Sequence, residues 1–471
     1  MSRQAVVVAA IWLVLHGSSI ARAQGGATPG ERLVCTVDPP WLQFEVSGDG
    51  KRLAFVTRSG EKETVVLDGR PGKPYDRIDS DSLVFSADGR RFAYSATLGK
   101  KHVVVDDGVE GDPYDAVHAR TLTFSPNGKR LAYVAMTGGA MRVVSDGKLE
   151  KPYDGIGPRL SFSPDGARLA YAAKAGKKEL VVVDGVERKR FARIGATIVF
   201  SGDGKRVAYA AGIGKKWLMV VDGEEGRLYD AIGMPFLLSP DGKRAVYAAE
   251  SGGKMVVVVD GKEGKRYDHI GKGNVALSPD GTRVAYAAMA HGKWHMIVDG
   301  EEREHDLFGD STIVFSPDSK RVAYAAKSGG RWSVIVDGAE GKPHDVVIND
   351  SIVFSPDGAH VAYVAGASGR QFVVVDGREG PAFHGIARRS LVFNPDGRHA
   401  AYWATTSANL NEWLVVVDGK PGKRSGDVLI KSGDDRWFNA IDRGVRFDAR
   451  GGFRHFVVRD KSIYVVEGRA D

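Results

Sequence analysis

The amino-acid sequence predicts an all-β protein, a β-propeller of four-stranded blades, and two observations carry this prediction. First, an Asp-Gly pair ends an apolar run ten times, and the nine spacings between these pairs are 38 or 39 residues, except for one of 42. Second, each unit holds four short stretches rich in β-branched and aromatic residues, separated by Gly, Pro, Asp or Lys. Four strands in about 40 residues, repeated in series, is the pattern of propeller blades. The Asp residues of the ten pairs are Asp68, Asp107, Asp146, Asp184, Asp222, Asp260, Asp299, Asp337, Asp376 and Asp418.

The unit at residues 198–235 shows the four expected strands. Strand a is 198–201, strand b is 206–211, strand c is 217–221 and strand d is 227–232. Each is a short apolar run, as expected for a strand that is buried on both faces between neighbouring sheets. Strand b combines a tyrosine with several alanines, so that adjacent sheets can approach closely while the ring fills the remaining space. A parallel β-helix, the alternative, would need shorter coils and fewer tight hairpins.

Strings such as "FSPDGARLAYAA" (162–173), followed by a "VVVDG" strand (181–185), resemble the TolB-type, WD-repeat-like propeller repeats of bacterial exported proteins. The resemblance extends from about Trp41 to Gly468 and implies a propeller that serves as a binding platform, as an accessory domain of a peptidase or, occasionally, as an enzyme. The chain departs from WD repeats because it lacks their Gly-His and Trp-Asp pairs. It departs from sialidase-type Asp boxes because no spacer separates Asp from Gly.

The ends of the repeat region predict how the ring closes. Ten full repeats run from about 41 to 444, and residues 445–468 supply strands a, b and c of an eleventh blade without a strand d. Residues 32–37 form an orphan strand before the first repeat, and pairing it as the missing strand d would remove two exposed sheet edges. The propeller therefore spans 32–468, with about eleven blades in one ring, and two fused smaller propellers are the alternative.

The N-terminus has the composition of a secretory signal peptide, residues 1–23, with a basic residue, an apolar run and an A-x-A ending that predicts cleavage after Ala23. A linker, 24–31, follows it, and 469–471 form a short C-terminal tail. We expect a periplasmic or secreted protein with no membrane span after cleavage, because every later apolar run is short. Cleavage removes Arg3 and Arg22, so the formal charge falls from +7 to +5, a small excess that does not favour nucleic acid as a partner.

Asp165 belongs to a repeated Ser-Pro-Asp-Gly string between strands a and b, and a tight turn explains all four residues. Proline sets φ at the second position, Asp caps the local backbone, and glycine accepts the left-handed conformation. A calcium site would need several convergent oxygens, whereas each turn offers one carboxylate on a different blade. His305 and His344 take the place of an aromatic residue of strand d and have no second ligand at metal spacing. We therefore expect no metal, no cofactor and no catalytic residue.

Function is expected where the repeats differ from one another. The segments between strand d and the next strand a vary while the strands around them hardly change, and scaffold-mounted variable loops are where binding usually occurs. The first residue of strand c is Trp in four units, which suits either a docking surface or packing between blades. The candidate ligand-binding residues are Arg120, Arg159, Lys272, Asp310, Asp350, Arg388, Arg389, Trp217, Trp294, Trp332 and Trp413.

These observations favour an exported, monomeric, non-catalytic propeller that binds a protein, peptide or glycan on the face that carries the b–c and d–a loops. The alternative is a propeller enzyme of lactonase or lyase type with an active site at the channel mouth. Mostly apolar residues in strand a, such as Val199 and Leu237, favour the binding platform, because a catalytic channel would be lined by titratable groups.

Overall fold

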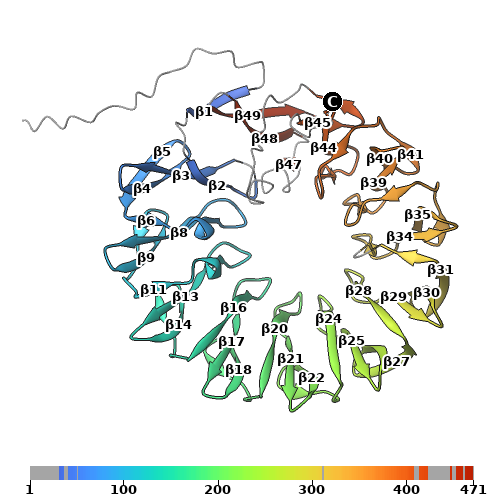
Figure 1. Ribbon diagram of the computed structural model, residues 1–471, viewed down its shortest axis with the longest axis horizontal. Helices are drawn as coiled ribbons and strands as arrows, with labels where there is room; N and C mark the ends of the chain where they lie inside the picture. The colour runs from blue at the N-terminus through green and yellow to red at the C-terminus, as the bar shows by residue number, and fades with distance from the viewer. Residues whose placement is uncertain are drawn as a thin grey trace, which may run out of the picture.

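The computed structural model describes residues 31–36, 41–49, 51–309, 312–407, 413–422, 446–447, 452–459 and 462–469. Within these residues the chain forms eleven separate antiparallel sheets, and the sheets stand side by side in one ring around a central opening (Figure 1). The predicted propeller and its single ring are confirmed. The predicted signal peptide, 1–23, and residues 24–30 of the predicted linker lie outside the described residues, whereas Glu31 belongs to β1 and Arg469, which was predicted in the C-terminal tail, belongs to β49.

Blades with a continuous innermost strand have four strands, and their order from the centre outward follows the chain. These blades are β2 (Trp41–Val46), β3 (Leu53–Ser59), β4 (Lys62–Leu67) and β5 (Arg70–Tyr75); β16 (Gly155–Phe162), β17 (Leu169–Ala175), β18 (Lys178–Val183) and β19 (Val186–Glu187); β20 (Arg193–Phe200), β21 (Val207–Ile213), β22 (Lys216–Val221) and β23 (Glu224–Glu225); β24 (Ala231–Leu238), β25 (Ala245–Ser251), β26 (Lys254–Val259) and β27 (Lys262–Tyr267); and β28 (His269–Leu277), β29 (Val284–Ala290), β30 (Lys293–Val298) and β31 (Glu301–His305).

In five further blades the innermost strand is split into two short pieces that pair with the same second strand. These are β6 (Arg77–Ile78), β7 (Val84–Phe85), β8 (Phe92–Leu98), β9 (Lys101–Asp106) and β10 (Val109–Glu110); β11 (Ala116–Val117), β12 (Thr123–Phe124), β13 (Leu131–Thr137), β14 (Ala140–Ser145) and β15 (Lys148–Leu149); β32 (Leu307–Phe308), β33 (Val314–Phe315), β34 (Val322–Ser328), β35 (Arg331–Val336) and β36 (Ala339–Glu340); β37 (Val346–Val347), β38 (Val353–Phe354), β39 (Val361–Ala367), β40 (Arg370–Val375) and β41 (Arg378–Glu379); and β42 (Gly385–Ile386), β43 (Val392–Phe393), β44 (Ala400–Thr405), β45 (Trp413–Val417) and β46 (Lys420–Pro421). Two single 3₁₀ turns, η1 (Ser80–Ser82) and η2 (Ala119–Thr121), separate the pieces in two of these blades.

The last blade joins the two ends of the described chain. Its strands are β47 (Arg446–Phe447), β48 (Gly452–Arg459) and β49 (Ser462–Arg469), and β1 (Glu31–Thr36) pairs antiparallel with β49 as the outermost strand. Figure 1 shows this sheet between the first blade and the tenth. The expected closure is confirmed, since β1 covers the sheet edge that β49 would otherwise expose.

The boundary between successive blades differs from the prediction. Strand d was expected to run through 227–232, but the outer strand β23 already ends at Glu225, and Tyr229 makes an isolated bridge to Trp217 of its own blade. The backbone N–H of Asp230 already donates to the carbonyl of Glu250 in the next blade (2.8 Å). The crossover therefore falls between the aromatic residue and the aspartate, and the variable segments that follow lie inside the next innermost strand.

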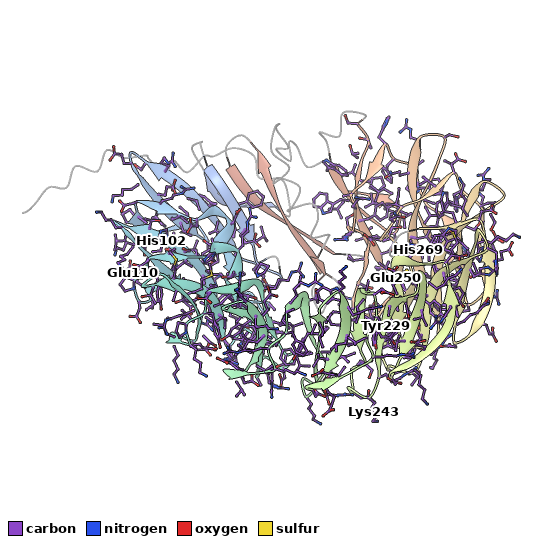
Figure 2. The ribbon with its side chains drawn as sticks, turned by 60° about the horizontal axis from the view of Figure 1, so that its bottom comes forward. His102, Glu110, Tyr229, Lys243, Glu250 and His269 are labelled. Atoms are coloured by element: carbon purple, nitrogen blue, oxygen red, sulfur yellow. The ribbon has the colours of Figure 1, made fainter. Side chains whose placement is uncertain are left out.

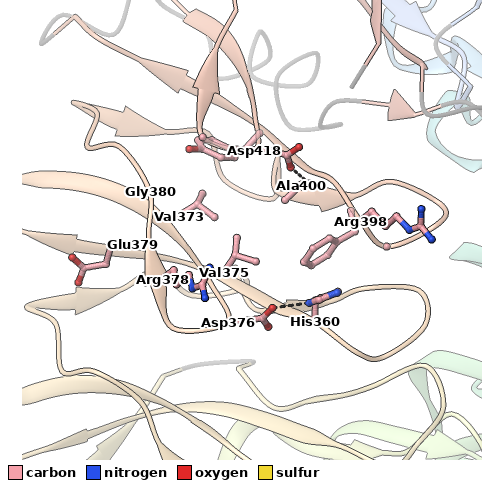
Figure 3. A pocket seen from close by; sticks show the side chains of 14 residues that line it. His360, Val373, Val375, Asp376, Arg378, Glu379, Gly380, Arg398, Ala400 and Asp418 are labelled. Atoms are coloured by element: carbon pink, nitrogen blue, oxygen red, sulfur yellow. Dashed lines mark hydrogen bonds and ion pairs between the residues drawn. The ribbon is translucent and has the colours of Figure 1, made fainter. Parts of the chain in front are cut away.

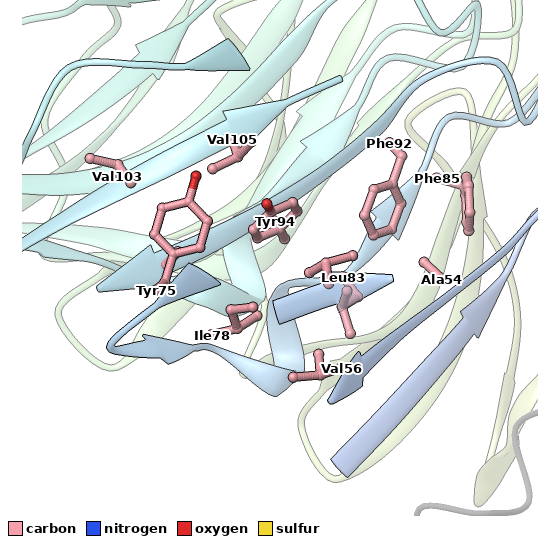
Figure 4. Close-up of a cluster of buried hydrophobic side chains, with 12 residues drawn as sticks. Ala54, Val56, Tyr75, Ile78, Leu83, Phe85, Phe92, Tyr94, Val103 and Val105 are labelled. Atoms are coloured by element: carbon pink, nitrogen blue, oxygen red, sulfur yellow. The ribbon is translucent and has the colours of Figure 1, made fainter. Parts of the chain in front are cut away.

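The hydrophobic core is divided into clusters, and nearly all of those described lie between two successive sheets. In Figure 4, Ala54 and Val56 of β3 face Phe92 and Tyr94 of β8, and Tyr75 closes the outer end of the cluster. The predicted packing of small and large residues on the second strand is confirmed in β21, where Ala208, Tyr209 and Ala211 are all buried. Because each cluster needs both neighbours, a blade is stabilised by its place in the ring.

The predicted Ser-Pro-Asp-Gly turn is confirmed at residues 163–166. The Ser163 hydroxyl donates to Asp165 Oδ1 (2.5 Å) and accepts the N–H of Arg168 (2.9 Å), while Asp165 Oδ1 also accepts the N–H of Ala167 (3.0 Å). Gly166 has a φ of +74°, which explains the glycine. These hydrogen bonds, with that of Ser163 as the main cause, hold the pKa of Asp165 below its usual range. Asp165 therefore organises a turn.

In the first eight blades an arginine directly before the second strand joins neighbouring blades, and sequence analysis did not identify it. Arg168 donates from Nε to Asp184 Oδ2 (2.9 Å) at the c–d turn of its own blade. Its Nη1 donates to the carbonyl of Lys205 in the next blade (2.6 Å), and its guanidinium lies 5.3 Å from the ring centre of Phe200. We call this contact the arginine staple. It recurs with Arg52, Arg91, Arg130, Arg206, Arg244, Arg283 and Arg321, each of which donates to a turn carbonyl of the following blade.

Candidate functional site

The variable segments form insertions in the innermost strands rather than loops at the channel mouth. In β24 the pairing with β25 shifts register between Ile232 and Phe236, so that the intervening residues bulge out of the ladder. The same shift occurs in β16, β20 and β28. Figure 1 places these four strands at the central opening. The insertions therefore line the inner edge of the ring.

Two of the predicted site residues, Arg120 and Arg389, each form an ion pair with an aspartate of the preceding blade. Arg120 on η2 donates to Asp81 on η1 (2.9 Å), and Arg389 donates to Asp350 at the same distance. Asp350 and Arg389 both have positive φ, of 60° and 56°. The charges of these two pairs thus partly neutralise one another across the blade boundaries.

Arg159 and Arg388 are exposed, and no ion pair of either side chain occurs within the described part of the chain. Arg159 lies in the inner strand β16. Arg388 borders a cavity of about 110 Å³ between the ninth and tenth blades, together with Asp350, Arg389 and apolar residues of the inner strands. Of the remaining charged candidates, Lys272 lies in β28, where the structure describes its backbone only. Asp310 lies outside the described residues.

The four candidate tryptophans pack against their own or the neighbouring sheet. Trp217 lies under the guanidinium of Arg193 (4.7 Å to the ring centre), and Trp294 meets Phe308 of the next blade edge to face (6.2 Å). Trp332 packs against the cluster between the eighth and ninth blades, and Trp413 is buried. The structure thus places Trp294 and Trp332 at contacts between successive blades, whereas Trp217 and Trp413 pack against residues of their own blades.

The column that contains these tryptophans also has a backbone role that sequence analysis missed. Where it holds Glu63, Glu179 or Gln371, the side chain accepts the N–H of the residue 15 positions later, at the start of the next inner strand (2.7 Å in each case). The sequence contained a signal for this role, namely a polar residue within an apolar strand. A buried polar group needs a hydrogen-bond partner, and the next inner strand supplies it.

Sequence analysis also missed the role of the aspartate that, in most blades, follows the aromatic residue of the outer strand. The carboxylate of Asp230 pairs with Lys216 of the preceding blade and accepts the N–H of Gly252 in the next blade (2.9 Å). Figure 2 shows Glu250 and Lys243 at opposite ends of β25, so this aspartate and the Ser-Pro-Asp-Gly turns lie on opposite faces. Both faces are therefore fixed by contacts between blades.

The described part of the chain contains no cluster of three His, Cys, Asp or Glu side chains that is arranged as a metal site. His305 and His344 pack edge to face on Tyr324 and Tyr363, and burial lowers the pKa of both imidazoles. They occupy the place of the aromatic residue that other blades carry at the end of the outer strand.

Comparison with known proteins yields structural similarity only. No family model matches the chain, and no curated protein matches it. Among solved structures, a eukaryotic initiation factor is similar at 14% identity, with 80% of this chain and 96% of that chain covered and a TM-score of 0.43. The Dos1 propeller is similar at 13% identity, with 63% and 89% covered and a TM-score of 0.31. The propeller domain of Myceliophteria thermophila Cps50 (Swd1) is similar at 12% identity, with 58% and 98% covered and a TM-score of 0.26. No helix in the described residues is long and apolar enough to cross a membrane.

Proposed function

We propose that the chain is an exported, TolB-type propeller that acts as a non-catalytic platform for a protein, peptide or glycan, bound at the insertions of the inner strands. The observation that supports this proposal most is a difference in charge pairing between the repeated strands and turns and the insertions of the inner strands. The arginine staples and the Asp230-type contacts satisfy the repeated charges within the ring, whereas Arg159 and Arg388 remain exposed on the insertions. Exposed guanidinium groups on a rigid scaffold are suited to recognise carboxylate or phosphate groups of a partner.

The ion pairs of Arg120 and Arg389 allow a sharp test. A pull-down with the mature protein from cell-envelope extract identifies a partner, and its affinity is then measured for two double variants. Arg159→Ser with Arg388→Ser removes the unpaired charges, and we expect a loss of affinity of more than tenfold, about 1.4 kcal/mol. Its melting temperature should hardly change, since exposed substitutions usually stay within about 0.5 kcal/mol each.

The matched controls use the paired arginines and the opposite face. Arg120→Ser with Arg389→Ser should lower affinity less, because those guanidinium groups already bind Asp81 and Asp350. Substituting four exposed lysines of the a–b turns should leave binding intact; they are Lys129, Lys205, Lys243 and Lys320, and Figure 2 shows Lys243 at the rim. Equal losses in the insertion and lysine variants would mean nonspecific charge attraction, and no loss in either would place the binding site elsewhere.

A further inference from the structure

The boundary between the ninth and tenth blades breaks the arginine staple. His360 stands where the eight preceding blades have arginine, and its Nδ1 lies 2.6 Å from Asp376 Oδ2. The imidazole thereby reproduces the contact that an arginine Nε makes with the aspartate of its own blade. The histidine side chain is too short to reach the turn of the next blade, so the hydrogen bonds to the carbonyl groups of that turn are missing.

The backbone carbonyl groups that would accept hydrogen bonds from an arginine at this position are nevertheless present. The residues that align with the staple's acceptors are Gly397 and Arg398, and no side chain in the described part of the chain donates to either carbonyl. Phe393 takes the position of the ring that carries the guanidinium at other boundaries, and the imidazole of His360 is stacked over it (6.4 Å, 29°).

A cavity of about 340 Å³ occupies this boundary (Figure 3). At the boundary between the seventh and eighth blades, where Arg283 is intact, the corresponding cavity is about 200 Å³. Val373, Val375 and Ala400 give the larger cavity an apolar wall. The hydroxyl of Tyr402 is buried there and has no hydrogen-bond partner among the described residues. Phe383 packs against this tyrosine, whereas several other boundaries place a second tyrosine at that position.

The charged side chains around the cavity give a small excess of negative charge when His360 is neutral. The carboxylates of Asp376, Glu379 and Asp418 line it, against the guanidinium groups of Arg378 and Arg398. Figure 3 shows the guanidinium of Arg398 directed away from the His360–Asp376 pair. The two free carbonyls and the Phe393 ring remain the groups nearest the point where a staple guanidinium would end, and both attract a planar cation.

We propose that this cavity binds the guanidinium group of an arginine side chain presented by a partner peptide. The bound group would donate to the carbonyls of Gly397 and Arg398, lie beside the Phe393 ring and bring its alkyl stem against the apolar wall. The site lies on the face of the a–b and c–d turns, opposite to the insertions at the inner strands, so it goes beyond the binding function proposed above and can fail or succeed independently of it.

The test uses the mature chain and Nα-acetyl-arginine methylamide as the probe, titrated by calorimetry or ligand-observed NMR. Binding is expected with a Kd on the order of 1 mM, the range of a single small contact. His360→Arg rebuilds the staple from within the chain, and it should weaken the probe more than tenfold while raising the melting temperature. His360→Ala frees Asp376 Oδ2 and enlarges the cavity, so the probe should bind it at least as tightly as the unaltered chain.

Two further arms make the outcome decisive. Arg321→His recreates the arrangement at the preceding boundary, where Gly358 and Ala359 supply the carbonyls, and we expect a second binding site for the probe. Nα-acetyl-lysine methylamide should bind more weakly, because it lacks the planar fork. The proposal is overturned if the arginine probe does not bind, if His360→Arg leaves its affinity unchanged, or if Nα-acetyl-aspartate methylamide binds this cavity in its place.

Discussion

The arginine staple predicts a measurable cost for removing one guanidinium group from the middle of the ring. Arg168→Ala deletes the hydrogen bonds to the carbonyls of Gly204 (3.2 Å) and Lys205 (2.6 Å), the ion pair with Asp184 and the contact with Phe200. The side chain is 27% exposed, so each term is taken near the low end of its range. About 1.5 kcal/mol for the charged hydrogen bonds, about 0.5 for the ion pair and about 0.5 for the cation–π contact give a loss of about 2.5 kcal/mol.

Hydrogen exchange measured by mass spectrometry is the suitable assay, because damage to one boundary should first raise local opening. A loss of about 2.5 kcal/mol corresponds to exchange roughly 70-fold faster in the peptides that contain the turns at 163–168 and 201–206. Peptides from distant blades should exchange as before. Arg168→Lys should recover little of the loss, since a single ammonium group cannot bridge the aspartate and the carbonyls.

The matched control is Lys205→Ala, which removes a neighbouring charge whose side chain is 82% exposed. It should change exchange by less than about threefold, in keeping with about 0.5 kcal/mol for exposed sites. The staple would be refuted as a source of stability if Arg168→Ala behaved like this control. Full recovery by Arg168→Lys would show that charge alone matters and that the fork geometry does not.

Two other predictions follow from the turns and from the ring closure. The hydrogen bond from Ser239 is the main reason that the pKa of Asp241 is lowered to about 2, so the stabilisation from this carboxylate is complete above its usual pKa and is lost as the pH falls towards 2. Asp241→Asn should therefore fold, as the Asn127 turn does, and its melting temperature should fall less than that of the unaltered chain between about pH 4 and pH 2. A parallel fall in both proteins would contradict this assignment. Deleting residues 31–36 uncovers β49, and limited proteolysis should then cut first within 445–469; a first cut in the middle of the chain would contradict closure by β1.

Most of the fold was readable from the sequence because the repeat itself carries it. The second and third strands, the Asp-Gly turns and the role of the N-terminal strand all follow from apolar runs bounded by turn residues. The blade boundary did not follow, because the run at 227–232 contains neither glycine nor proline. Only the hydrogen bond from Asp230 to Glu250 shows that it belongs to two sheets.

The charged candidates show why the site was harder to predict than the fold. Asp81 and Arg120, and likewise Asp350 and Arg389, are opposite charges 39 positions apart, which is one repeat. Comparing each loop with the next at that offset would have predicted both ion pairs. The cavity at His360 had a similar signal, because a histidine stands there where the eight preceding repeats have arginine. The sequence does not show which groups the arginine side chain contacts in those repeats, so it could not show what the histidine leaves unpaired.

The pairing of β1 with β49 also constrains when the ring can be completed during folding. The partners are separated by nearly the whole chain, so the first strand to be synthesised waits for the last one before either edge is covered. Until then β1 has no partner strand and the last blade has no outermost strand, so an unpaired strand edge is exposed. A partner strand from a second chain could dock on such an edge during this interval. Slow synthesis of the final residues should therefore increase strand exchange between molecules, whereas closure of the ring leaves neither β1 nor β49 unpaired.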